Sequence, residues 1–129
     1  MISVLVAHDE WEIRELLEAF LGHSGYYVVT VPNAEAALLM MDVLARPRVV
    51  IIGVHLRCWP DGPWLADRLR NLYPTTATIL VMDEGTVRPA DRLPHGVVSY
   101  LIKPLEREQV LQAVEDGLRW SLETEKAPL

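Results

Sequence analysis

The sequence lacks several features that particular protein classes need. It has one cysteine, Cys58, so an internal disulfide framework is excluded. Its uninterrupted apolar stretches reach only about half a dozen residues, far below the roughly 20 that a membrane-spanning helix requires. No short basic segment precedes an apolar stretch at the amino terminus, as it would in a secretory signal. We therefore expect a cytoplasmic protein with no membrane partner.

Basic charge and phosphate-binding motifs are also scarce. The chain has 12 Lys and Arg against 18 Asp and Glu, a net charge of -6, whereas a nucleic-acid binder needs clustered basic residues. It contains no glycine-rich phosphate loop, no G-x-S-x-G motif and no Ser-His-Asp arrangement. The sequence thus argues against nucleic-acid binding by this domain, against an enzyme and against a bound cofactor.

What the chain does contain is enough apolar material for one core. Its 129 residues are 50% hydrophobic, the size and composition of a single globular domain. We expect that domain to cover residues 1–122. Residues 123–129 are predicted to be a polar tail or the start of a linker to an output domain.

Five short runs rich in Val and Ile predict strands buried on both faces, as in a parallel sheet. The expected strands are 2–7, 26–31, 48–54, 78–82 and 97–102.

Helical periodicity fills the intervals between these runs. The side chains expected to face inward are Ile13, Leu16, Leu17, Phe20 and Leu21, then Ala37, Met41, Leu44 and Ala45, then Leu65, Leu69 and Leu72, and last Leu111, Val114, Leu118 and Leu122. Gly22 is expected to stop the first helix, Asn33 to cap the second and Pro63 to begin the third. The interval 83–96 holds Gly85, Pro89 and Pro94, which leaves a short or irregular helix.

This alternation predicts an α/β fold with a doubly wound five-stranded parallel sheet. Chemistry in such folds lies at the carboxyl ends of the strands. The residues just after the first, third, fourth and fifth strands therefore determine function.

Three segments at these positions resemble one family. Residues 4–10 (VLVAHDE), 47–52 (PRVVII) and 100–105 (YLIKPL) are similar, in order and spacing, to the CheY-like receiver domain of response regulators. The resemblance implies the flavodoxin-like (βα)5 fold and a role in two-component phosphorelay signalling.

The resemblance also assigns a role to each site residue. In working receivers an aspartate at the position of Gly53 accepts phosphate, two acids after the first strand hold Mg²⁺, and a Thr or Ser at the position of Met82 contacts the phosphoryl group. The site positions here are His8, Asp9, Gly53, His55, Met82 and Lys103. Of the family's charged set only Asp9 and Lys103 remain, and we expect them to pair directly and to bind no metal.

The resemblance, with these departures, implies a pseudo-receiver that acts by protein interaction without phosphorylation. A histidine kinase, an output domain or another signalling protein is the expected partner. Self-association through the face of the fifth strand and last helix is a further possibility. Tyr100 stands at the family's switch position and is expected to stay in one fixed state.

Three alternatives remain open at this point. The first is phosphorylation of a non-standard residue; Asp61 is favoured instead as part of a helix start. The second is a transition metal held by His8, His55 and Asp9, or a small ligand in the same pocket. The third is redox sensing by Cys58.

The tryptophans are candidate interface residues. Trp11, Trp59 and Trp64 lie close in sequence to the expected site and could make its mouth aromatic. Trp120 is predicted to lie on the outer face of the last helix and to be the better interface candidate.

Overall fold

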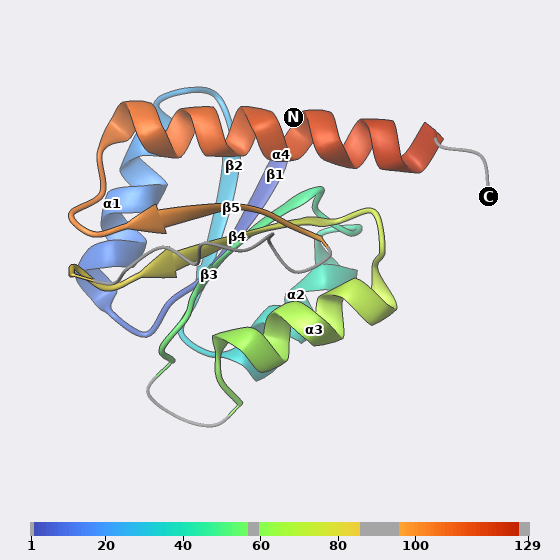
Figure 1. Cartoon of the computed structure of the whole chain (residues 1–129), viewed down its shortest axis with the longest axis horizontal. Helices are drawn as coiled ribbons and strands as arrows, with labels where there is room; N and C mark the ends of the chain where they lie inside the picture. Colours follow the sequence, from blue (N-terminus) through green and yellow to red (C-terminus); the bar gives the residue numbers. More distant parts are fainter. Residues whose placement is uncertain (1, 57–59, 86–95, 127–129) are drawn as a thin grey trace.

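The computed structural model describes residues 2–56, 60–85 and 96–126 of the chain. Its five parallel strands form one sheet in the order β2-β1-β3-β4-β5, with helices on both faces (Figure 1). The elements are β1 (Ser3–Ala7), α1 (Trp11–Gly22), β2 (Tyr27–Val31), α2 (Ala34–Val43), β3 (Val49–Gly53), α3 (Gly62–Leu72), β4 (Ala77–Met82), β5 (Val97–Ile102) and α4 (Arg107–Lys126). The doubly wound α/β fold expected from the sequence is confirmed, and the five strands lie within two residues of their predicted bounds.

The sheet divides two apolar layers. Side chains alternate along each strand, so the two faces of β3 enter two separate cores. Helices α1 and α4 cover one face, and α2 and α3 cover the other (Figure 1). All five residues of β3 are buried, which explains why this central strand is a continuous apolar run.

Two predicted core positions at helix ends are wrong. Ala45 is exposed because α2 ends at Val43 and the chain then turns with a positive φ of 55° at Ala45. Leu72 is 49% exposed because it is the last residue of α3, where the helix leaves the sheet. In both cases the sequence pattern predicts inward-facing residues up to one turn beyond the part of the helix that packs against the sheet.

The last helix packs through small residues, which the sequence prediction missed. Its buried positions are Val110, Ala113, Val114, Gly117 and Ser121. A Cβ atom added to Gly117 would lie 3.3 Å from the Val49 side chain, so the helix lies close against β3 and β4. The inward face is centred on Ala113 and Gly117.

The orientation of this inward face corrects two predictions about the last helix. Leu122, expected in the core, is 43% exposed. Trp120, expected on the outer face, is partly buried and packs against the core between the sheet and α1 and α4. The helix continues to Lys126, so residues 123–126 belong to α4.

Some predictions fall on residues 57–59 and 86–95, outside the described part of the chain. They include Cys58, Trp59 and the short or irregular helix in the interval 83–96. In the part that is described, no helix is long and apolar enough to cross a membrane.

Candidate functional site

The predicted site residues lie at, or just after, the carboxyl ends of neighbouring strands. The register places Ala7 of β1 beside Ile52 of β3, and Gly53 of β3 beside Val81 of β4. The segments that leave these strands therefore start from one edge of the sheet. The site is built there, between the first turn of α1 and the loops that follow β3, β4 and β5.

The imidazole of His8 occupies the space above Gly53. A Cβ atom built on Gly53 would lie 2.7 Å from His8 Cδ2 and 3.1 Å from Nε2, closer than such atoms pack. His8 is only 2% exposed, although it follows the last residue of β1. The place from which an acceptor aspartate would project is thus filled by a neutral ring.

Hydrogen bonds and burial fix the state of this ring. The backbone N–H of Glu10 donates to Nδ1 of His8 at 3.0 Å, so the ring carries its proton on Nε2. Burial lowers the pKa of His8 from its ordinary value, and the positive charge of Lys103 lowers it further. Arg14 holds the same turn by donating to the carbonyl oxygen of His8 at 2.8 Å.

Lys103 is held by two carboxylates, and neither is the one that we predicted. Its Nζ lies 3.0 Å from Glu10 Oε1 and 3.2 Å from Asp83 Oδ1. The predicted pair with Asp9 is wrong, because Asp9 turns toward His8, with its Oδ1 3.5 Å from Nδ1 of that ring. Glu10 and Asp83 are residues that the sequence prediction missed; both were visible as acids directly after strand ends.

The carboxylates change the charge state of the lysine. Burial by itself would lower the pKa of Lys103, but hydrogen bonds to Glu10 and Asp83 outweigh it and raise the pKa. The ammonium group, whose side chain is 14% exposed, already has two anionic partners. An incoming anion would have to compete with both of them.

The remaining candidates do not converge on this point. His55 is exposed, and the described residues contain no group of three His, Cys, Asp or Glu side chains that could hold a metal ion. Asp61 caps α3 by accepting a hydrogen bond from the backbone N–H of Trp64 at 3.1 Å, as the helix-start interpretation predicted.

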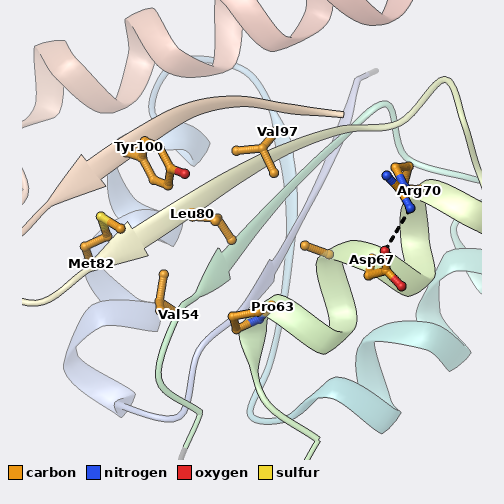
Figure 2. Close-up of a pocket in the computed structure, with 9 residues that line it drawn as sticks. Val54, Pro63, Asp67, Arg70, Leu80, Met82, Val97 and Tyr100 are labelled. Carbon is orange, nitrogen blue, oxygen red and sulfur yellow. Dashed lines mark hydrogen bonds and ion pairs between the residues drawn. The ribbon is translucent and has the colours of Figure 1, made fainter. Parts of the chain in front are cut away.

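Met82 and Tyr100 pack in the core between the sheet and the helices α2 and α3. Both side chains line a separate cavity between α3 and the strands β4 and β5 (Figure 2). Tyr100 is 8% exposed. The cavity also contacts Val54, just after β3.

Comparison with known proteins places this geometry in a family. The sequence profile described as the response regulator receiver domain matches residues 4–115. The chain belongs to the response regulator receiver family. Receiver domains are signalling modules of two-component systems, and the family contacts histidine kinases and output domains.

Individual relatives agree with this assignment. The chain is 35% identical over 115 residues to the response regulator protein FleR of Pseudomonas aeruginosa, covering 87% of this chain and 24% of FleR. It is 31% identical over 120 residues to the transcriptional regulatory protein AruR of the same species, covering 90% of this chain and 49% of AruR. The chain thus spans half or less of the length of these relatives.

Solved structures show the same fold. NtrX from Brucella abortus, determined in complex with ADP, superposes with a TM-score of 0.88 at 25% identity, over 98% of this chain and 29% of NtrX. The isolated receiver domain of NtrX gives a TM-score of 0.83 at 24% identity, over 90% of this chain and 98% of that domain.

Within this receiver, the tryptophans differ in exposure. Trp11, the first residue of α1, is 59% exposed, as its position on the helical wheel predicted. Trp64 is partly buried and packs against the core between the sheet and α2 and α3. Of these two, Trp11 alone is exposed beside the site.

Proposed function

We propose that this receiver domain signals by protein interaction without being phosphorylated at the family's acceptor position. The observation that carries the proposal is the His8 ring packed over Gly53. Gly53 has no side chain to attack a phosphodonor, and the ring fills the place where such a side chain would stand.

The charges around the site support the same proposal. A hard divalent cation needs several oxygen ligands, and His8 replaces the first of the family's two acids. Lys103, whose partner in working receivers is the phosphoryl group, is already neutralised by Glu10 and Asp83. Met82 offers a thioether, which donates no hydrogen bond to a phosphoryl oxygen. Phosphorylation of Asp61 is not favoured, because its carboxylate caps α3.

Phosphate transfer gives the direct test. The purified protein is incubated with acetyl phosphate and Mg²⁺, with a phosphorylatable receiver domain run in parallel, and intact mass is measured. We expect no phosphoryl adduct on the wild type or on Gly53→Asp, because that variant still lacks the first acid and the hydroxyl. A Mg²⁺-dependent adduct on either protein would contradict the proposal.

The interaction half of the proposal places the partner at the exposed edge around Trp11. A histidine kinase or an output domain is the proposed class of partner in the cytoplasm, with self-association through β5 and α4 as the alternative. Trp11→Ala should weaken binding to the genomically paired kinase by about 2 kcal/mol if the ring is a buried anchor. Binding that is unchanged in Trp11→Ala, measured by calorimetry, would remove Trp11 from the interface.

A further inference from the structure

The molecule has a cavity close to Gly53, the residue at the family's phosphoacceptor position. It is a cavity of about 350 Å³ between α3 and the strands β4 and β5 (Figure 2). Its described walls are Val54, Pro63, Ala66, Asp67, Arg70, Leu80, Met82, Val97 and Tyr100. The site of His8 and Lys103 is separate from it, since neither residue lines this cavity.

The walls are apolar and the only charges among the described lining residues cancel. Leu80 and Val97 are 6% and 7% exposed, so they form a buried wall. Asp67 and Arg70 lie together at one end (Figure 2), with Arg70 Nη2 3.0 Å from Asp67 Oδ1. Their side chains are 63% and 41% exposed, which places this ion pair at the solvent side.

We propose that this cavity binds a small, neutral aromatic molecule of about two fused rings. An apolar cavity of roughly 150 Å³ is enough for benzene, so a cavity more than twice as large suits a two-ring molecule. This inference goes beyond the proposed function and does not depend on it.

The chemistry of the walls selects this class of ligand. A charged group inside the cavity would lose its hydration without gaining a buried counter-charge, because Arg70 is already paired with Asp67. The thioether of Met82 favours contact with an aromatic ring. Buried aliphatic walls with few polar groups are typical of small-molecule sites.

The backbone connects one wall of the cavity to the site of Lys103. The backbone N–H of Lys103 donates to the carbonyl oxygen of Met82 at 3.0 Å, and Asp83 follows Met82 directly. Met82 is thus the residue that links a wall of the cavity to the segment that holds Lys103.

The test compares two probes with the same ring frame, 2-naphthol, which is neutral at pH 7, and 2-naphthoate, which is anionic. Binding is followed by the methyl NMR signals of Val54, Leu80, Met82 and Val97. We expect 2-naphthol to give saturable shifts centred on these methyl groups and 2-naphthoate to bind at least about tenfold more weakly. Equal affinity for both probes, or no saturable shift with 2-naphthol, would overturn the proposal.

Two variants show whether the probe occupies this cavity. Ala66→Phe fills it from α3, and Pro63→Phe narrows it from an exposed position that tolerates a larger side chain. Each should weaken 2-naphthol binding by at least about tenfold. The matched control is Ala19→Phe on the exposed face of α1, which should leave the affinity unchanged.

The folding of each variant is checked by circular dichroism. If circular dichroism shows that Ala66→Phe does not fold, Pro63→Phe decides alone. Wild-type affinity in the folded variants would contradict the proposed site. Because the readout is binding, its outcome is independent of whether the protein accepts phosphate.

Discussion

Two neighbouring parts of the molecule are packed in opposite ways. Above Gly53 the His8 ring leaves no room for even one added carbon atom. Between α3 and the strands β4 and β5, by contrast, there is a cavity of about 350 Å³. Val54, which follows Gly53 directly in the chain, lines this cavity, so the two places are close together.

Under our proposal that the phosphoacceptor is lost, the difference explains how the fold can survive that loss. Replacing the acceptor by glycine would leave a void, and an empty void costs free energy because its walls lose contacts. The histidine that replaces the first acid fills that void.

The largest effect on stability is expected at Gly62, which packs against the backbone of Gly53 and Val54. A Cβ atom on Gly62 would overlap the backbone carbonyl oxygen of Gly53 and lie 2.8 Å from Val54 Cα. Neither backbone group can yield as a side chain would. Gly62→Ala should therefore lower the free energy of unfolding by about 3 kcal/mol or more, measured by urea denaturation.

The control for this variant is another helical glycine. Gly22 ends α1 with no heavy atom within 4 Å of an added Cβ. Gly22→Ala should change stability by at most about 1 kcal/mol, in the stabilising direction. Equal effects at the two positions would contradict the role given to the close approach at Gly62.

The next effect tests the contact between His8 and Gly53 itself. Gly53→Ala should cost about 1–3 kcal/mol of unfolding free energy, because its Cβ meets the imidazole. In a His8→Ala background the same change should cost less than about 1 kcal/mol, because the ring is gone. A double-mutant cycle by urea denaturation measures the coupling, and a coupling near zero would mean that the ring lies elsewhere.

Much of the fold was predictable because its signals are local. Strands buried on both faces must be continuous apolar runs, and β3 is one. The cap at Asp61 was readable from the Asp-Gly-Pro sequence at the start of α3. The face of α4 was not, because close packing against the sheet selects small residues such as Gly117, and a search for large apolar side chains misses them.

The composition of the site was predictable, but its pairings were not. Position after a strand end identified His8 and Lys103 as site residues. Which carboxylate reaches Lys103 depends on how the first turn of α1 directs Asp9 and Glu10, and neighbouring residues in sequence point in different directions. That His8 would cover Gly53 depends on a side-chain rotamer, which the sequence does not specify.

A smaller effect on stability, of opposite sign, is expected for a substitution that fills the cavity between α3 and the strands β4 and β5. Ala66 lines the cavity, so Ala66→Leu adds apolar atoms where there is room and should stabilise the protein by about 0.5–1 kcal/mol. Ala37 of α2 packs in the same core but is fully buried. Ala37→Leu should therefore cost about 1–3 kcal/mol. Thermal and urea unfolding of both variants would show whether the cavity is truly open; a loss of stability in Ala66→Leu similar to that in Ala37→Leu would show that it is not.

The smallest effect concerns the contribution of His8 to the pH dependence of stability. Burial and the charge of Lys103 lower the pKa of His8 in the folded state below its ordinary value of 6.5. Between these two pKa values the unfolded chain binds more protons than the folded one, so stability rises with pH in this window. The contribution of neutral His8 to stability is fully present above the unfolded pKa and is lost as pH falls through it toward the folded pKa.

His8→Gln should therefore show a shallower fall in unfolding free energy on acidification from pH 7.5 to pH 5.5 than the wild type, measured by urea denaturation at each pH. His55→Gln, at an exposed histidine, is the matched control and should keep the wild-type slope. A His8→Gln slope equal to that of wild type would mean that the ring over Gly53 is not held in its neutral form by burial.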